Sequence, residues 1–224
     1  MYRLLPRPTL RGVEERKHRR STLERKRALL EATVEQVGES GYASVTHRAV
    51  TARAGLPTTS IGYFFASIDD LTHEAMRTFV AEEFERLDAL SAFLENTSAS
   101  PDEVIAAFAA SSEARGNESL ALLEAYLRAA RDPASRVLVE EYLRAADAVT
   151  QGAAALAGAE IDPPTARGVV ALINGFTVLD SALPDAADIA TKKRALRTML
   201  IGALFEQGHE DAARALRTQP DQAT

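Results

Sequence analysis

Apolar residues recur at steps of three and four along most of the chain, which is the spacing of one face of an α-helix. The longest such stripe predicts a helix over residues 68–95, with Ser67 as its N-cap and with Asp69 and Asp70 at the positive end of its dipole. No segment of useful length alternates apolar and polar residues as a strand does. The pattern therefore predicts an all-α fold. The stripe consists of Met76, Val80, Phe84, Leu87, Leu90 and Leu94.

Glycine and proline punctuate the rest of the helical pattern. Pro163 and Pro164 suit the first turn of a helix, where the missing amide proton costs nothing. The segment after Gly208 is polar, and we expect it to fray. The expected helices, besides those of the next paragraph, cover residues 22–39, 101–114, 118–130, 132–157, 163–183 and 187–207, and the first of them could extend backward.

Residues 41–71 predict two short helices joined by a tight turn. Thr46 is expected to cap the first, because its hydroxyl can accept a free amide proton of the next turn. Gly55 supplies the left-handed residue that ends this helix. The second helix is expected to start at Pro57, with hydroxyl side chains in its first turn and with Ile61, Phe64 and Phe65 buried. A helix-turn-helix places such a second helix in the major groove of DNA.

Six residues of this segment are candidates for DNA contact, because they sit in the first turns of the two helices or on the same side of the second. Hydroxyls there can reach base edges or phosphate, and the free amides favour phosphate. The alternatives are that Thr59 or Ser60 only caps the helix and that Tyr63 only packs. Gly62 either lets the backbone approach DNA closely or weakens the helix. The candidates are His47, Arg48, Thr58, Thr59, Ser60 and Tyr63.

The charge of the chain is divided unevenly. The net charge is −6, yet residues 1–70 contain 12 Lys and Arg against 8 Asp and Glu, and residues 71–224 contain 14 against 24. Local positive charge on an acidic protein is typical of a part that meets phosphates. The basic residues 1–22 could lie along DNA or form a disordered leader.

The run of residues 25–72 resembles the DNA-binding domain of TetR-type transcriptional regulators, which commonly reads T-V-R-D-I-A-x-x-A-G-V-S-x-G-T-L-Y-x-H-F-x-S-K-E-x-L. Departures are Pro57 at the usual N-cap Ser, Gly62 at a phosphate-binding Tyr, Phe64 at a frequent His and Ile68 at a Lys that touches the DNA backbone. The positions that fit or nearly fit are Thr46, Arg48, Val50, Ala54, Gly55, Leu56, Ser60, Ile61, Tyr63, Phe65, Ser67 and Leu71.

The resemblance implies an effector pocket in the helical remainder. Asn174 is an amide within the apolar run GVVALINGFTVL, and a buried amide needs partners that a ligand could supply. A mostly apolar lining with a few polar groups suits a small apolar or amphipathic effector. The alternative is that the candidates are ordinary core residues. The candidates are Phe84, Phe108, Tyr126, Tyr142 and Asn174.

The resemblance also implies a homodimer formed through the last two helices, since a palindromic operator requires two reading heads. Small residues on the first of these helices permit close approach of a partner helix, and an apolar stripe follows on the second. Packing within a single chain is the alternative. The expected interface residues are Gly168, Ala171, Gly175, Leu179, Leu196, Leu200 and Leu204.

No catalytic signature is found in the sequence, so we expect neither an enzyme nor a cofactor. There is no P-loop, dinucleotide fingerprint or G-x-S-x-G, and the four histidines lack the HExxH spacing of a zinc site. Glu82 and Glu83 are adjacent on a helix and are interpreted as solvated charges. The chain has no Cys, which fits a reducing cytoplasm, and no run long enough for a membrane span.

These observations predict a helix-turn-helix regulator, a repressor released from a palindromic operator by an effector. Its expected partners are double-stranded DNA, a second copy of the chain and a small molecule, and no membrane. The alternatives are a helical protein-interaction module and a regulator that needs no effector. The expected organisation is a basic extension (1–22), a DNA-binding domain (23–70), an effector and dimerisation domain (71–208) and a polar tail (209–224).

Overall fold

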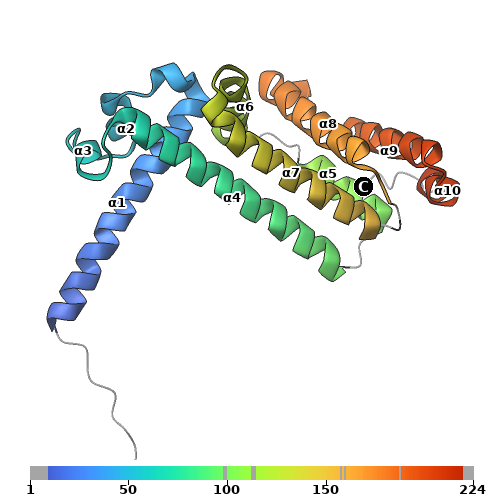
Figure 1. Ribbon diagram of the computed structural model, residues 1–224, viewed down its shortest axis with the longest axis horizontal. Coiled ribbons are helices and arrows are strands. Elements are labelled where there is room, and N and C mark those ends of the chain that lie inside the picture. The colour runs from blue at the N-terminus through green and yellow to red at the C-terminus, as the bar shows by residue number, and fades with distance from the viewer. Residues whose placement is uncertain are drawn as a thin grey trace, which may run out of the picture. The chain divides into compact units, whose positions relative to one another are not determined.

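The computed structural model describes residues 10–97, 100–111, 115–156, 158, 160–186 and 188–218, and these residues form helices and no strand (Figure 1). The fold is therefore all-α, as the periodicity predicts. The elements are α1 (Leu10–Ser40), η1 (Tyr42–Ser44), α2 (His47–Arg53), α3 (Ser60–Phe64), α4 (Ile68–Thr97), α5 (Pro101–Ser111), α6 (Asn117–Arg131), α7 (Pro133–Leu156), α8 (Pro163–Ala182), η2 (Pro184–Ala186), α9 (Ile189–Glu206) and α10 (Glu210–Thr218).

The chain divides into two compact units, Met1–Thr78 and Phe79–Thr224. Helix α4 belongs to both, because it begins at Ile68 in the first unit and ends at Thr97 in the second. No helix among the described residues is long and apolar enough to cross a membrane.

The first unit is built around a small core beneath α1, α2 and α3. Thr46 caps α2 as expected, because its hydroxyl accepts from the backbone N–H of Ala49 at 3.2 Å. Gly55 follows α2 with φ of +65°, a conformation that side chains with a Cβ rarely adopt, and so reverses the chain toward α3. The buried core residues are Leu29, Ala32, Val50, Ile61, Phe65 and Leu71.

Two helix boundaries in this unit differ from the sequence prediction. Helix α1 starts at Leu10 rather than residue 22, because the intervening charged residues are good helix formers with no Pro among them. Helix α3 starts at Ser60 rather than Pro57, and the backbone N–H of Ser60 donates to the Pro57 carbonyl to close a turn before it. Residues 1–9 of the expected basic extension lie outside the described part of the chain.

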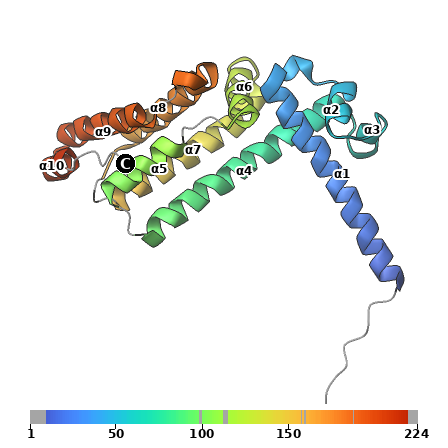
Figure 2. The same cartoon turned by 180° about the vertical axis from the view of Figure 1, so that it is seen from behind.

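In the second unit, α8 packs against α6, α7 and α9, and α9 packs in addition against α5 and α10 (Figure 2). Two ion pairs join these helices, and the first is buried while the second is partly exposed. Lys192 of α9 donates to the Asp180 carboxylate of α8, and Arg197 of α9 donates to Asp102 of α5. A buried charge must be paired to be tolerated, so the Lys192–Asp180 contact fixes the register of α9 against α8.

The expectation of a frayed tail after Gly208 is wrong, because residues Glu210–Thr218 form helix α10. The backbone N–H of His209 donates to the Leu204 carbonyl at 2.8 Å, and this bond begins the turn into α10. Ala213 and Leu216 lie three residues apart on one face and are buried in the main core of the unit. The segment holds three alanines and one leucine at helical spacing, and the sequence prediction overlooked this short apolar face.

We expect Leu216→Ala to lower the free energy of unfolding by about 2–5 kcal/mol, because it deletes a buried side chain and leaves a cavity. Leu127→Ala is the matched control, since Leu127 is exposed on α6 and its loss should cost less than about 0.5 kcal/mol. Denaturant unfolding of both variants measures the difference. Equal, small effects would contradict the docking of α10.

Candidate functional sites

The outward side of α2 and α3 carries five of the six candidates for DNA contact. His47 and Arg48 are exposed in the first turn of α2, and Thr58 and Thr59 are exposed before α3. Tyr63 on α3 is 73% exposed, and its ring meets that of Phe64 edge to face with centroids 4.8 Å apart. All five side chains are therefore open to solvent on the two helices and the turn between them, and we call them the exposed polar surface.

Ser60 does not belong to this surface. It is only 9% exposed and lies on the inner side of α3 next to the buried Ile61. The prediction that its hydroxyl faces DNA is therefore wrong. The sequence predicts a helix that starts at Pro57, three residues before Ser60, whereas α3 starts at Ser60 itself and this residue faces the core.

Ion pairs within the first unit hold α2 and α3 in place and separate structural from available basic residues. Arg53 of α2 donates to Glu35 of α1 at 3.1 Å and also to Glu39. Lys26 pairs with Glu74 at 2.6 Å and lies 5.3 Å from the centre of the Phe65 ring. Among the described residues, no acidic side chain pairs with Arg48. Arg48 is thus the cation of α2 that a phosphate can reach.

Gly62 is exposed on α3, and a Cβ built there would meet no atom within 4 Å. The protein fold therefore does not require glycine at this position. Its absent side chain leaves the α3 backbone open to close approach from outside, while its backbone freedom weakens a helix of five residues.

A cavity of about 460 Å³ lies within the second unit and brings together three of the five pocket candidates. Phe108, Tyr142 and Asn174 line it. Tyr126 and Phe84 stand directly behind this lining: the Asn174 amide nitrogen donates to the Tyr126 hydroxyl oxygen at 3.2 Å, and the Phe84 ring packs edge to face on Tyr142 at 6.1 Å. We call this space the polar cavity, because charged side chains also line it.

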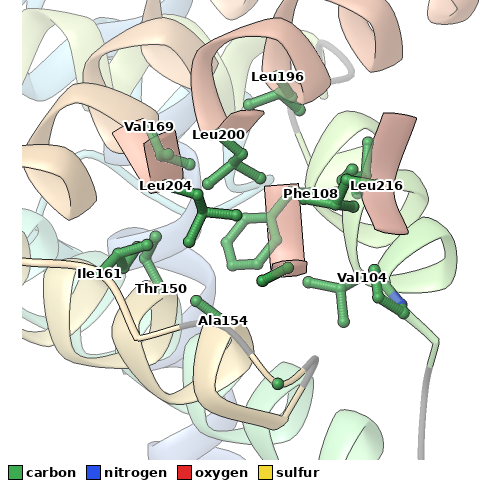
Figure 3. A pocket seen from close by; sticks show the side chains of 14 residues that line it. Val104, Phe108, Thr150, Ala154, Ile161, Val169, Leu196, Leu200, Leu204 and Leu216 are labelled. Carbon is green, nitrogen blue, oxygen red and sulfur yellow. The ribbon is translucent and has the colours of Figure 1, made fainter. Parts of the chain in front are cut away.

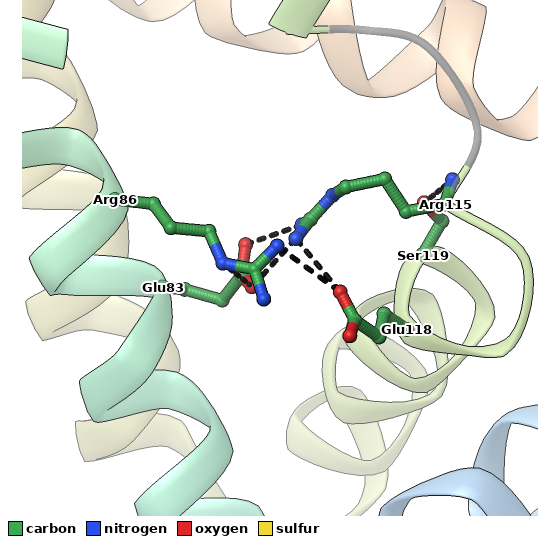
Figure 4. Close-up of polar contacts among 5 residues, drawn as sticks. All are labelled: Glu83, Arg86, Arg115, Glu118 and Ser119. Atoms are coloured by element: carbon green, nitrogen blue, oxygen red, sulfur yellow. Dashed lines mark hydrogen bonds and ion pairs between the residues drawn. The ribbon is translucent and has the colours of Figure 1, made fainter. Parts of the chain in front are cut away.

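Glu83 and Arg115 form the charged wall of the polar cavity (Figure 4). The Glu83 side chain on α4 is 5% exposed, and the Arg115 guanidinium donates to its two oxygens at 2.6 and 3.1 Å. Glu118 accepts from Arg115 at 2.9 Å and pairs with Arg86 at 3.1 Å. The interpretation of Glu83 as a solvated charge is therefore wrong. Its partner lies 32 residues away, and no local pattern signals such a pair.

Desolvation by burial raises the pKa of Glu83 above its ordinary value, although the hydrogen bond and the positive charge of Arg115 oppose this. Burial likewise raises the pKa of Tyr142 to about 12 and raises the pKa of Tyr126. Both phenols are therefore protonated at neutral pH, and each keeps a hydroxyl proton to donate. The cavity thus combines aromatic faces, neutral donors and one paired carboxylate.

A second cavity, of about 250 Å³, lies between α5, α7, α9 and α10 (Figure 3). Its lining is aliphatic except for Phe108 and Thr150, and these two residues also line the polar cavity. We call this space the apolar chamber.

The residues expected at a dimer interface divide between the inside and the outside of the unit. Leu196 and Leu204 are buried in the core of their own chain, and Leu200 lines the apolar chamber. The assignment of Leu196 and Leu204 to an interface is therefore wrong, because both side chains pack inward. Leu200 is half-buried, and its place at an interface stays a prediction. Gly168 is also used within the chain, since a Cβ there would lie 2.3 Å from Met199 Cε.

The other expected interface residues are on the outer face of α8. Ala171 and Gly175 are exposed, and Leu179 is 57% exposed. Further apolar side chains, which the sequence prediction did not include, are exposed on α8, just after it and at the end of α9. They are Val178 and Leu183 of the same segment and Phe205 of α9.

Both parts of the chain match family models. Residues 29–75 match the model for bacterial regulatory proteins of the tetR family, and residues 96–206 match the model for the tetracyclin repressor-like C-terminal domain. The comparison with curated proteins found no match.

Solved structures of regulators are similar to the chain over most of their length. A member of the TetR family (SCO1917) from Streptomyces coelicolor A3 is 29% identical, with a TM-score of 0.61 over 79% of this chain and 98% of the other. The multidrug binding protein EbrR, complexed with imidazole, is 30% identical, with a TM-score of 0.55 over 79% and 94%. EbrR is also known in complexes with malachite green, proflavin and ethidium. A transcriptional regulator from Rhodococcus sp. Rha1 is 21% identical with a TM-score of 0.64 over 81% and 96%, and shares the fold.

We expect Arg115→Ala to destabilise the protein by about 1–3 kcal/mol at about pH 8, because it leaves Glu83 buried without its main partner. The folded-state pKa of Glu83 is raised above its unfolded value, so its contribution to stability falls as pH rises through the folded-state pKa. Removing Arg115 raises this pKa further, so the loss should be smaller at about pH 5.

Denaturant unfolding at the two pH values measures this effect. The double variant Arg115→Ala with Glu83→Gln is the control, because it removes the buried charge and should recover most of the loss at the higher pH. A pH-independent loss that the second substitution does not relieve would contradict the buried-pair account.

Proposed function

The chain belongs to the TetR family of bacterial transcriptional regulators, and we propose that it is a homodimeric repressor that a small molecule releases from its operator. The observation that carries this proposal is the presence in one chain of an exposed polar surface on a helix-turn-helix and of an aromatic cavity with a paired carboxylate. The first suits DNA, and the second suits a ligand.

In this proposal α3 enters the major groove of the operator. Tyr63 offers its phenol to DNA, and Thr58 and Thr59 offer hydroxyls to bases or phosphate. Arg48 contacts a phosphate beside the first turn of α2, and His47 lies next to it. The exposure of all five side chains supports this arrangement.

The effector would occupy the polar cavity. The multidrug binding protein EbrR binds imidazole, malachite green, proflavin and ethidium, which are aromatic, and the three dyes carry a delocalised positive charge. The Tyr142 and Phe108 rings offer faces and edges to such a molecule, and Glu83 offers a negative charge. An aromatic cation could therefore take over part of the role that Arg115 fills at Glu83. The open cavity favours this reading over a regulator that needs no effector.

Helix α4 is the element through which binding would act on the DNA-binding unit. Glu83 sits on α4, and the same helix begins at Ile68 in the first unit. Release requires that the effector bind the DNA-incompetent state more tightly than the DNA-bound state. A palindromic operator presents two half-sites about 34–36 Å apart. A change in the distance between the two DNA-binding units of the dimer is therefore enough to prevent one unit from reaching its half-site.

The dimer would form through the outer face of α8 with part of α9. Gly175 lets a partner helix approach closely, and Leu179, Val178 and Phe205 supply apolar area that is exposed in the single chain. A two-fold dimer uses the same patch on both copies.

The test of DNA recognition is binding to a labelled fragment of the DNA upstream of the protein's own coding sequence, over a salt series and with footprinting. We expect protection of a palindrome and an affinity that falls steeply with salt. Arg48→Ala should weaken binding, because it removes one phosphate contact from each DNA-binding unit. The slope of log affinity against log salt concentration should fall in magnitude by about one for each unit.

Arg131→Ala is the matched control, since Arg131 is exposed on α6 and should leave the slope unchanged. Adding ethidium to the wild-type complex then tests release. If neither the upstream DNA nor a genome-wide selection of sites yields a protected sequence, the regulator described here is wrong and a helical interaction module takes its place.

We expect Leu179→Glu to weaken the dimer by a hundredfold or more, about 3 kcal/mol, because each copy would bury an unpaired carboxylate. Analytical ultracentrifugation over a concentration series measures the change. Leu127→Glu introduces the same charge at an exposed leucine of α6 and should leave the association unaltered. A Leu179→Glu variant that still sediments as a tight dimer would place the interface elsewhere.

A further inference from the structure

We propose that the apolar chamber binds the hydrocarbon tail of an amphiphilic effector whose polar or aromatic head occupies the polar cavity. The inference rests on the proposed function, because it assigns a second compartment to the same effector site. It also assigns a role to α10, whose residues Ala212 and Leu216 form part of the chamber wall.

The lining of the apolar chamber suits hydrocarbon, because it offers almost no hydrogen-bonding group to a polar ligand. Its one side-chain hydroxyl is that of Thr150, which already donates to the Ala146 carbonyl at 2.8 Å. A water molecule needs two to four polar partners to reside in a cavity, and these walls do not provide them. A space of this kind stays dry and gains free energy when apolar atoms fill it. The aliphatic walls are formed by residues such as Val104, Ile161, Val169, Leu196 and Leu204 (Figure 3).

Two residues separate the chamber from the polar cavity and belong to both linings. Thr150 of α7 is one, and Phe108 of α5 is the other. The Phe108 ring projects among the aliphatic side chains of the chamber (Figure 3), and its backbone carbonyl accepts from the Ser111 hydroxyl at 2.7 Å. The two cavities therefore adjoin at these two side chains. In this proposal a change of the Phe108 rotamer opens the passage through which the tail enters the chamber.

The difference in polarity between the two spaces determines which end of the ligand each space would bind. Charged and hydrogen-bonding groups gather in the polar cavity around Glu83, Arg115 and Asn174, while the chamber is lined by apolar side chains apart from Thr150. An apolar cavity of about 150 Å³ holds the six carbons of benzene, so a chamber of 250 Å³ holds roughly ten carbon atoms by proportion. The ligand class is thus a single-tailed amphiphile of medium chain length.

The test is binding of a homologous series of 1-alkanols, from butanol to dodecanol, to the free wild-type protein by isothermal titration calorimetry. Each added methylene should tighten binding about fourfold while the tail fills the chamber. The gain should stop when the chamber is full, at roughly ten carbon atoms. An affinity that does not depend on chain length would overturn the proposal.

Two alanines of α7 give a matched pair of variants, since both are buried and lie eight residues apart on one helix. Ala154 lines only the apolar chamber, and Ala146 lines only the polar cavity. Ala154→Leu should shorten the chain length at which affinity stops rising by roughly three carbons, the number that leucine adds to alanine. Ala146→Leu should leave that length unchanged. The reverse result would place the tail in the polar cavity and overturn the proposal.

Leu200→Ala guards against a folding defect in Ala154→Leu, because it enlarges the chamber and should shift the limiting chain length upward. If neither variant moves the limit, the chamber is not the tail site. These titrations contain no DNA, so they are independent of the operator assay. Failure to protect any operator would count against the proposed function alone, and a flat alkanol series would count against the two-compartment site alone.

Discussion

The second unit is organised around a carboxylate whose side chain is only 5% exposed. Glu83 is almost fully buried on α4, and an unpaired charge in that position would cost several kcal/mol. Arg115 satisfies both of its oxygens, and this contact holds the start of α6 against the middle of α4. Glu118 and Arg86 extend the pair into a balanced group of four charges. The polar cavity keeps its shape because these side chains cannot move apart without exposing an uncompensated charge.

Local signals were sufficient to predict the first unit. A cap such as Thr46 and a left-handed residue such as Gly55 act within a few residues of their place in the sequence, so the helix-turn-helix could be located without a structure. Tyr63 and Ser60 show the limit of prediction from local signals. They lie three residues apart and were placed on one face, but the actual start of α3 turned Tyr63 outward and Ser60 inward.

Pairings between distant segments could not be predicted in the same way. Leu179 and Leu204 belong to equally apolar helical stripes, yet Leu204 is buried in its own chain and Leu179 is exposed. Periodicity identifies a face but does not say which neighbour covers it. The same holds for Glu83, whose partner is 32 residues distant in the sequence. It also holds for α10, whose residues Ala213 and Leu216 pack into the core of the second unit. Three of the five pocket candidates, Phe108, Tyr142 and Asn174, line the polar cavity, and the polar ends of Tyr142 and Asn174 on apolar stripes were the signal for two of them.

The chamber beneath α10 also has a consequence for the volume of the protein. Space that is empty in the folded chain is filled by solvent when the chain unfolds, so the protein with its solvent shrinks on unfolding. Hydrostatic pressure therefore favours unfolding of the second unit in part through this chamber, whose wall α10 completes. An occupant that fills the void removes this volume difference, and the liganded protein would then resist compression better than the free one.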